Sequence, residues 1–374
     1  MPWKECSIVS ERQELVLLMQ QPQANITALC RRFGVSRKSA YKWLRRFKAT
    51  GLPGLSNQSR RPRDSPRRTP EALEEKILAV RQEHPAWGPR KLKRFLQNQH
   101  VMHLPAVSTI EAILGRNGLI GSEAARQHSP LTRFEKAFPN ALWQMDFKGP
   151  FAMVQGRCHP LCVLDDHSRY ATALVACAHE RQEAVKHTLT SAFRRYGLPE
   201  AMLMDNGAAW ASHTALTLWL IRLGITVCHG RPAHPQTQGK LERFNRTLAA
   251  EVIGQKVFGT LQECQRGFDQ WRELYNLQRP HEALGLACPV TRYRASDRPF
   301  PEALPPIEYL PGDQVLLTHR HTGQLVYQGK RWPVGCAFAG QPVAVRPGRT
   351  DGLLHVFFCH QKVAEIDLRR TGEV

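Results

Sequence analysis

The sequence predicts a chain of several domains, with all-α units at the N-terminus, an α/β core in the middle and a small β-barrel at the C-terminus. Three observations lead to this prediction. The length of 374 residues is more than one hydrophobic core usually organises. Apolar residues recur at helical spacing up to about residue 125, and strands alternate with helices from about residue 141. Short strands separated by turn residues fill the last part of the chain.

The chain is strongly basic. Its 52 Lys and Arg against 32 Asp and Glu give a formal net charge of +20, which favours a polyanionic partner such as nucleic acid. No stretch approaches the roughly 20 apolar residues of a membrane-spanning helix, and the first residues have no apolar signal region. The ten cysteines are scattered without a Cys-x-x-Cys pair, which is typical of reduced thiols. We therefore expect a cytoplasmic protein without membrane contact.

Residues 1–55 are predicted to form a DNA-binding domain of three helices. Gly34 suits a tight turn after the second helix, and Ser36 is a candidate N-cap for the third. A helix, a Gly turn and a basic helix are typical of the helix-turn-helix motif, whose last helix enters the major groove. The alternative is a solvated basic helix, but residues 31–48 contain no acidic residue, which favours DNA. The candidate DNA contacts on this helix are Arg37, Lys38, Lys42, Arg45 and Arg46.

Residues 56–68 form a basic linker rich in arginine and proline. Arg60 and Arg61 are candidate DNA contacts, because arginines in an extended arm can enter a narrow minor groove or pair with phosphates. A flexible linker without DNA contacts fits the composition equally well.

Residues 69–125 repeat the helical pattern, so we expect a second helix-turn-helix-like domain. Thr69-Pro70-Glu71 is predicted to start one helix, with Thr69 as its cap and Pro70 at its first position. Pro89 is predicted to start the next helix, and Ser108 is predicted to cap the last.

Residues 138–296 are predicted to form a mixed β-sheet with helices on both faces. The expected strands cover residues 142–147, 159–164, 169–177, 202–205 and 225–228, of which the second and third form a hairpin. The expected helices cover residues 183–196 and 210–223 and the segment that begins near residue 240.

Three carboxylates in this region carry the candidate chemistry. Asp146 lies in a strand among apolar residues, Asp205 ends a strand, and Glu242 lies in the first turns of a helix. Carboxylates at strand ends and on a facing helix can converge on Mg²⁺ or Mn²⁺, and two such ions can catalyse an in-line displacement at phosphorus. The basic residues beside Glu242, predicted to hold the DNA backbone, are Lys240, Arg243 and Arg246.

Each acid also has a structural interpretation. Asp205 precedes Asn-Gly and could be a turn residue only, and Glu242 could be a surface residue of its helix. Asp165 and Asp166 follow a predicted strand, where turns favour aspartate, so we interpret them as turn residues rather than metal ligands.

Three blocks resemble the catalytic blocks of bacterial insertion-sequence transposases of the DDE group, whose core is similar to that of retroviral integrases. They are Trp143-Gln-Met-Asp146, Asp205-Asn-Gly207 and His234-Pro-Gln-Thr-Gln-Gly-Lys-Leu-Glu-Arg-Phe-Asn-Arg-Thr-Leu248. The block Tyr275-Asn-Leu-Gln-Arg-Pro-His-Glu-Ala-Leu284 resembles the one that follows this core. The resemblance extends over roughly residues 10–300. Its helix-turn-helix start, in one uninterrupted frame, fits the insertion-sequence branch.

The resemblance implies a ribonuclease H-like core that carries out strand transfer with two Mg²⁺ or Mn²⁺ ions. Asp146, Asp205 and Glu242 take the places of the catalytic metal ligands. Between the last two lie 36 residues, one more than is usual in the family, which a loop can absorb. The implied partners are element ends and target DNA, bound by a homodimer or larger assembly in a bacterial cytoplasm, associated with the nucleoid.

Residues 306–374 are predicted to form the small β-barrel, similar to the C-terminal domain of integrase-type proteins. The expected strands cover residues 315–318, 325–327, 342–346, 353–358 and 363–368.

The predicted function is that of a DNA transposase that binds element ends, frees a 3′-hydroxyl by metal-dependent cleavage and transfers it into target DNA. The main alternative is a DNA-binding regulator or domesticated transposase with an inactive core. A nonspecific nuclease of the same fold is a third interpretation.

Overall fold

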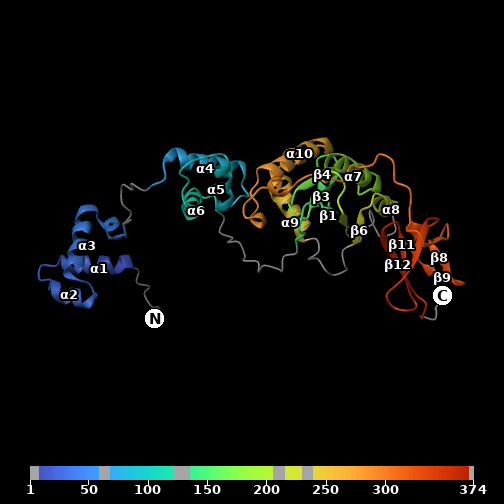
Figure 1. The fold of residues 1–374 in the computed structure, drawn as a ribbon. Helices are drawn as coiled ribbons and strands as arrows, with labels where there is room; N and C mark the ends of the chain where they lie inside the picture. The colour runs from blue at the N-terminus through green and yellow to red at the C-terminus, as the bar shows by residue number, and fades with distance from the viewer. Residues whose placement is uncertain (1–7, 59–67, 121–134, 205–214, 230–238, 370–374) are drawn as a thin grey trace. The chain divides into compact units, whose positions relative to one another are not determined.

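The computed structural model describes residues 8–58, 68–120, 135–204, 215–229 and 239–369 (Figure 1). The chain divides into two compact units, residues 1–68 and 69–374. The predicted site residues Arg60, Arg61 and Asp205 lie outside the described residues.

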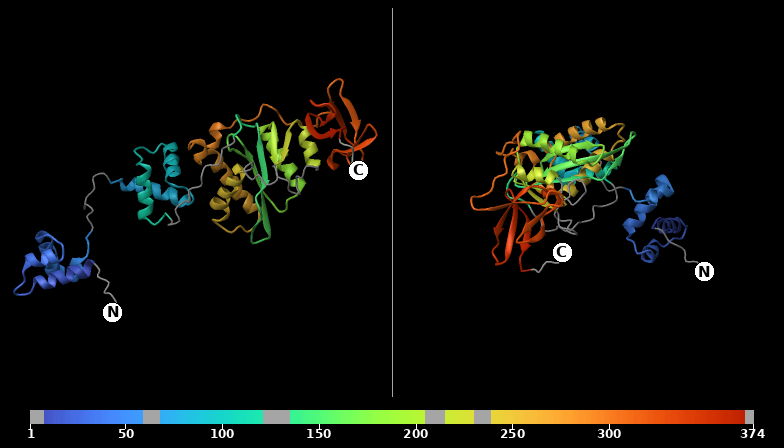
Figure 2. Two further views of the ribbon diagram at one scale, coloured as in Figure 1. Left: turned by 90° about the horizontal axis from the view of Figure 1, so that it is seen from below. Right: turned by 90° about the vertical axis from the view of Figure 1, so that its right-hand side faces the viewer.

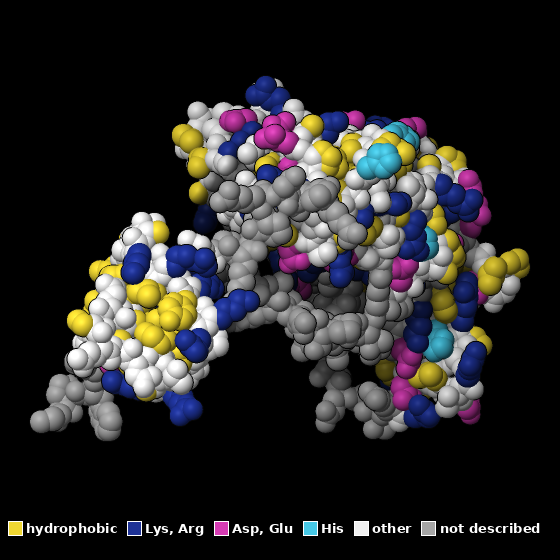
Figure 3. All heavy atoms as spheres, turned by 90° about the vertical axis from the view of Figure 1, so that its left-hand side faces the viewer, with side chains coloured by type: hydrophobic (Ala, Val, Ile, Leu, Met, Phe, Trp, Pro, Cys, Tyr) yellow, Lys and Arg dark blue, Asp and Glu magenta, His cyan; other side chains and the backbone are white. Residues whose placement is uncertain are grey.

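The N-terminal unit has the three predicted helices. Ser36 caps the third helix as expected, because its side chain accepts a hydrogen bond from the Ser39 amide at 3.1 Å. Leu15, Met19 and Ala40 form the centre of its small apolar core. Figure 3 shows Lys and Arg side chains around a central hydrophobic area on the visible face of this unit. The elements are α1 (Ile8–Met19), α2 (Ile26–Arg32), α3 (Arg37–Thr50) and the short 3₁₀ helix η1 (Leu52–Leu55).

The second unit begins with three further helices. Trp87 and Phe95 pack edge-to-face at 5.2 Å in their core. Two predicted helix starts are displaced by one or two residues. Pro70 occupies the N-cap rather than the first helical position, and Ser108 lies inside the last helix, whose N-cap is Ala106. The helices are α4 (Glu71–Glu83), α5 (Pro89–Asn98) and α6 (Val107–Arg116).

The central domain is the predicted mixed sheet. Its strand order is β2-β3-β1-β5-β6, and β4 pairs with β3 as the expected hairpin. β1 pairs antiparallel with β3 but parallel with β5, and β5 is parallel to β6. The strands are β1 (Trp143–Phe147), β2 (Phe151–Ala152), β3 (Arg157–Asp165), β4 (Ala171–Cys177), β5 (Ala201–Met204) and β6 (Thr226–His229).

Helices cover both faces of this sheet (Figure 2). The helices that contain Leu189 and Leu220 pack on one face of the sheet. The helices that contain Phe244 and Phe268 pack on the other face. The helices are α7 (Gln182–Tyr196), α8 (Ala215–Arg222), α9 (Gly239–Leu248) with its π-helical continuation η3 (Ala249–Ile253), and α10 (Leu261–Leu277), which is followed by the 3₁₀ helices η4 (Glu282–Leu284) and η5 (Pro289–Arg292). None of the helices in the described ranges is long and apolar enough to cross a membrane.

The predicted C-terminal β-barrel is not confirmed, because the described strands form two separate sheets and no closed barrel. One sheet has the order β12-β11-β10-β7, and β8 and β9 pair only with each other. Gln328 and Gly329 join β8 to β9 with φ angles of 50° and 76°, which gives a tight hairpin that does not extend into the larger sheet. The elements are β7 (Gln314–Leu317), β8 (Gln324–Tyr327), β9 (Lys330–Pro333), the 3₁₀ helix η6 (Cys336–Phe338), β10 (Pro342–Pro347), β11 (Leu353–Phe358) and β12 (Gln361–Asp367).

Gly197 ends α7 at a point where the chain passes close to a distant segment. Its φ is +75°, and a Cβ atom there would lie 2.6 Å from the Ser296 carbonyl oxygen. Gly197→Ala is expected to lower the free energy of unfolding by more than about 1–2 kcal/mol, which is the cost of a left-handed backbone conformation for an ordinary residue. Gly156→Ala is the matched control, because Gly156 has φ +82° with nothing within 4 Å. Equal losses in thermal unfolding of the two variants would contradict the close approach.

Candidate active site

The pleat of β1 divides its side chains between the two faces of the sheet. Trp143 and Met145 lie in the core under α7 and α8, so Gln144 and Asp146 face the opposite side, which α9 covers. Asp146 lies directly opposite Cys162 on β3, and Cys162 packs in the core beneath α9. Burial, with the Asp146 charge as the next cause, raises the pKa of the Cys162 thiol. Asp146 itself is half-buried.

α9 presents Glu242 on the same side of the sheet. Leu241 and Phe244 anchor the helix in the core beneath it, which turns Glu242 outward with 63% of its side chain exposed. Its carboxylate accepts a hydrogen bond from Arg246 one turn later, at 2.9 Å. An exposed pair of this kind contributes little to stability, so the carboxylate can exchange this partner for another cation.

The third predicted acid follows β5 directly. β5 lies beside β1 with Gln144 paired to Leu203, and it ends at Met204. The chain continues into Asp205, which lies outside the described residues. Within the described ranges no group of three or more His, Cys, Asp or Glu side chains is arranged to hold a metal ion. The structure thus brings Asp146 and Glu242 to one side of the sheet and leaves the complete trio a proposal.

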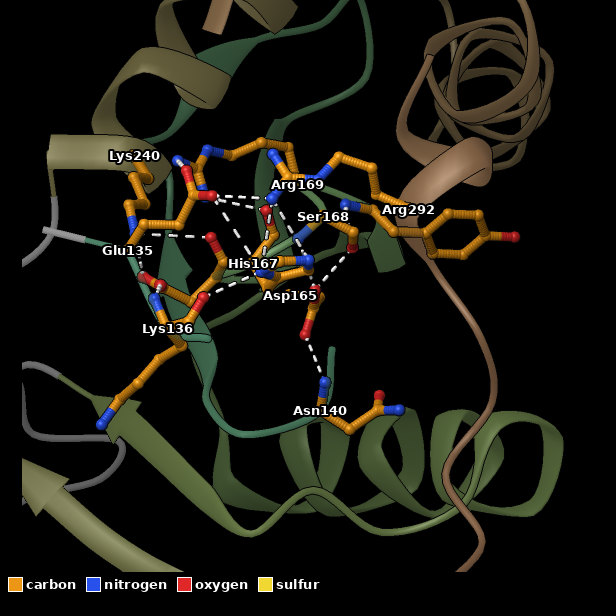
Figure 4. A network of polar contacts seen from close by, with 11 residues as sticks. Glu135, Lys136, Asn140, Asp165, His167, Ser168, Arg169, Lys240 and Arg292 are labelled. Carbon is orange, nitrogen blue, oxygen red and sulfur yellow. Dashed lines mark hydrogen bonds and ion pairs between the residues drawn. The ribbon is translucent and has the colours of Figure 1, made fainter. Parts of the chain in front are cut away.

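The turn between β3 and β4 is held by hydrogen bonds, as its interpretation as a turn predicts. Asp165 is fully buried, and its carboxylate accepts from the amides of Asn140 and Ser168 at 2.7 and 2.8 Å. Burial raises the pKa of Asp165. Figure 4 shows Asn140 and Ser168 around Asp165, with Arg169 nearby. These contacts fix the shape of the turn.

Glu135 ties the segment before β1 to this same turn. Its carboxylate pairs with Arg169 at 2.9 Å and with Arg292 at 2.8 Å, and His167 lies beside it (Figure 4). Arg292 belongs to η5, after the core helices. The turn therefore joins segments that are far apart in the sequence, an arrangement that no spacing in the sequence indicates.

Lys240 is placed differently from the other basic residues of α9. Its ammonium lies 2.5 Å from the buried Asp166 carboxylate, and only 15% of its side chain is exposed. Burial lowers the pKa of Lys240. Arg243 and Arg246 are exposed. The described position of Lys240 favours a structural role over the predicted contact with DNA, while both arginines remain accessible to a phosphate backbone.

The predicted DNA-contacting residues of α3 also divide into two groups. Arg46 is half-buried, with its guanidinium 5.2 Å from the Trp43 ring. Arg12 of α1 stacks on the same ring at 3.9 Å, so this side of α3 faces its own domain. Tyr41 of the same helix is also exposed, by 47%. The exposed predicted contacts are Arg37, Lys38, Lys42 and Arg45.

The block around residues 275–284 has a structural role in the described core. Asn276 exchanges both hydrogen bonds of its amide with the backbone of Ala171 on β4, at 2.8 and 3.0 Å. Arg279 pairs with Glu251 of η3 at 2.8 Å, and 6% and 8% of the two side chains are exposed. Trp271 donates its indole N–H to the same carboxylate at 3.0 Å. These contacts connect α10 to β4 and to the end of the α9 helix.

His281 is buried, with its ring edge-on to Tyr275 at 4.5 Å. Burial, aided by the Arg279 charge, lowers the pKa of His281 to about 3. Between its ordinary unfolded value and about 3, the unfolded chain binds a proton that the folded chain does not. Stability is therefore expected to fall as the pH decreases through this window, by up to about 1.4 kcal/mol per pH unit from this residue.

Urea unfolding at pH 7, 6 and 5 measures this dependence. The His281→Gln variant should show a shallower loss of stability towards pH 5 than the wild-type protein. Parallel pH dependences of the two proteins would contradict the burial of a neutral His281.

Models of known protein domains match most of the described parts of the chain. Two models of the integrase core domain match residues 137–235 and 223–289. A helix-turn-helix domain model matches residues 11–63, and a homeodomain-like domain model matches residues 39–114. Residues 313–374 match the C-terminal domain of IS481 family transposases.

Two curated relatives are proteins of bacterial insertion elements. The uncharacterized 31.7 kDa protein of insertion element IS407 from Burkholderia multivorans is 27% identical over 258 residues, which are 67% of this chain and 91% of that protein. The uncharacterized 39.2 kDa protein of IS476 from Xanthomonas euvesicatoria is 25% identical over 70% of this chain and 75% of its own length.

Among solved structures, the HTLV-2 integrase catalytic core domain in complex with magnesium is 15% identical and covers 42% of this chain and 97% of that chain, with a TM-score of 0.32. The chain thus combines helix-turn-helix domains, an integrase core domain and a transposase C-terminal domain, and it is similar to proteins of bacterial insertion elements.

Proposed function

We propose that the protein binds the ends of its element and catalyses metal-dependent 3′-end cleavage followed by strand transfer into target DNA. The observation that carries this proposal is the placement of Asp146 and Glu242. Both lie on the side of the sheet that α9 covers. β5, parallel to β1, ends one residue before Asp205. Carboxylates from two neighbouring strands and a facing helix are a suitable donor set for hard divalent cations.

Asp146, Asp205 and Glu242 would hold two Mg²⁺ or Mn²⁺ ions. Two features of the described acids suit this role, since Asp146 is only half-buried and Glu242 has an exposed ion pair to give up. When bound, the ions would lower the pKa of an attacking water or hydroxyl and stabilise the leaving oxygen. A metal-assisted displacement of this kind needs no covalent link between protein and DNA.

Basic side chains would bind and orient the DNA. Arg243 is exposed one residue after Glu242 and can hold a phosphate of the strand being cut. The exposed basic face of α3 would read the element end, with Arg60 and Arg61 following the backbone. Because two element ends must be joined to one target, we expect a homodimer or larger assembly on DNA in the bacterial cytoplasm, associated with the nucleoid.

Cleavage of a labelled element-end duplex by the full-length protein tests the proposal. We expect binding without added metal and a nick at the 3′ end only when Mg²⁺ or Mn²⁺ is present. A duplex with a scrambled end sequence should be neither bound tightly nor cut. Tight binding to the element end without cleavage in either metal would instead support a DNA-binding regulator with an inactive core. Equal cleavage of both duplexes would support a nonspecific nuclease.

A further inference from the structure

One buried carboxylate contacts the strand and the helix that carry the two described acids. Asp166 is fully buried. Its Oδ1 atom accepts a hydrogen bond from Gln144 Nε2 of β1 at 2.8 Å and lies 2.5 Å from Lys240 Nζ of α9. Its Oδ2 atom accepts from the Lys136 amide at 2.8 Å. Figure 4 shows Lys240 reaching from α9 to this turn, beside Lys136.

The two side chains that contact Asp166, those of Gln144 and Lys240, each belong to a residue two positions before a candidate metal ligand. Gln144 precedes Asp146 by two residues on β1, so both face the same side of the sheet. Lys240 precedes Glu242 by two residues on α9. Side chains two residues apart on a helix point to different sides of it. This explains why Lys240 is directed inward, with 15% of its side chain exposed, while Glu242 is directed outward with 63% exposed.

The contacts of Glu242 itself do not define its position strongly. Its partner Arg246 lies on the same helix, so this pair moves with α9 and cannot fix the helix relative to β1. The Asp166–Lys240 pair joins different elements and is shielded from water, where an ion pair has a strong preference for one geometry.

We propose that Asp166 is a positioning residue, which holds β1 and the first turn of α9 at a fixed spacing through Gln144 and Lys240. In this way it would set Asp146 and Glu242 to face one metal site. The inference rests on the proposed function for its consequence in catalysis. The positioning of α9 is a property of the free protein and can be measured without DNA or metal.

Three variants separate positioning from loss of folding. Lys240→Met removes the cation and keeps most of the side-chain length. Because this leaves the buried Asp166 charge unpaired, the double variant Asp166→Asn/Lys240→Met removes both charges and is the variant expected to fold best. Lys240→Arg retains a cation and should restore much of the wild-type behaviour. Asp313→Asn is the control, since Asp313 pairs with Arg346 in the C-terminal sheet domain.

Two measurements are made on the full-length protein. Hydrogen–deuterium exchange of residues 239–248 reports the order of α9, and electron paramagnetic resonance of free Mn²⁺ reports metal binding. In Lys240→Met and in the double variant we expect faster exchange over these residues and Mn²⁺ affinity lowered by about 10- to 100-fold, the usual effect of losing a partner behind a metal ligand. The half-saturating Mg²⁺ concentration for end cleavage should rise similarly, with end binding unchanged. Asp313→Asn should change none of these quantities.

The outcomes distinguish this inference from the proposed function. Wild-type exchange and Mn²⁺ affinity in a folded double variant would overturn the positioning role even if cleavage occurs. Faster exchange and weaker Mn²⁺ binding in the variants would support it even if the wild-type protein cuts no DNA, a result that would count against the proposed function alone.

Discussion

Glu242→Gln is expected to lower metal-dependent cleavage of the element end by about a thousandfold, because a neutral amide cannot replace a carboxylate that holds a metal ion. Metal ions contribute several kcal/mol of charge stabilisation in such reactions, and about 4 kcal/mol corresponds to this factor. Glu242 is exposed and its ion pair is a surface contact, so the variant should fold as the wild-type protein does. Cleavage rates and element-end affinity measured side by side give the result.

Glu302→Gln is the matched control. Glu302 is also an exposed acid paired with an arginine, Arg194, at 2.6 Å, but it lies outside the candidate site. Its cleavage rate should equal that of the wild-type protein. If Glu242→Gln cuts at the wild-type rate, Glu242 is not a metal ligand and the assignment of the site fails.

Glu251→Gln is expected to lower the free energy of unfolding by about 3–5 kcal/mol, the usual loss when one partner of a buried ion pair is removed. Glu251 accepts hydrogen bonds from both Arg279 and Trp271, so its neutralisation leaves a buried guanidinium without its counter-charge. The pair connects η3 to the segment after α10. Urea unfolding followed by tryptophan fluorescence measures the change.

The double variant Glu251→Gln/Arg279→Met tests the cause. It removes both charges, and it should be more stable than Glu251→Gln alone, because the loss arises from an unpaired buried charge. A double variant that loses the sum of the two single effects would contradict a direct pair.

Much of this architecture could be predicted from local patterns. Strong periodicity predicted α3 and α7 together with the β3–β4 hairpin, and Ser36 marked a helix start that the structure confirms. Capping preferences predicted the exact start of a helix less well, because neighbouring residues can each serve as the N-cap. Ser108 has the chemistry of an N-cap, yet α6 begins earlier, at Val107.

Contacts between residues far apart in the sequence, or between strands, could not be predicted from local patterns. Lys240 belongs to a basic run beside Glu242 and so resembles a DNA contact, but its partner Asp166 lies 74 residues earlier in the chain. The C-terminal strands were mostly located correctly, but β9 was missed and the pairing of β8 with β9 could not be read from alternation alone. A closed barrel requires strand partners that turn residues do not specify.

Part of the candidate site was also predictable. The placement of Asp146 on the α9 side of β1 follows from alternation along one strand, once the face that α9 covers is known. The burial of Arg279 and His281 was not predictable, because a block rich in polar residues resembles a functional surface. The counter-charge of Arg279 comes from Glu251 of η3, 28 residues earlier in the chain.

Strand transfer of a labelled element end into plasmid DNA is the most direct test of the central claim, that Asp146, Asp205 and Glu242 form one metal site for DNA joining. The full-length wild-type protein is compared with Asp146→Asn, Asp205→Asn and Glu242→Gln. We expect Mg²⁺-dependent joined product for the wild-type protein and a loss of about a thousandfold or more in each variant, with end binding retained. Joining at the wild-type rate by any one of the three variants would contradict the claim.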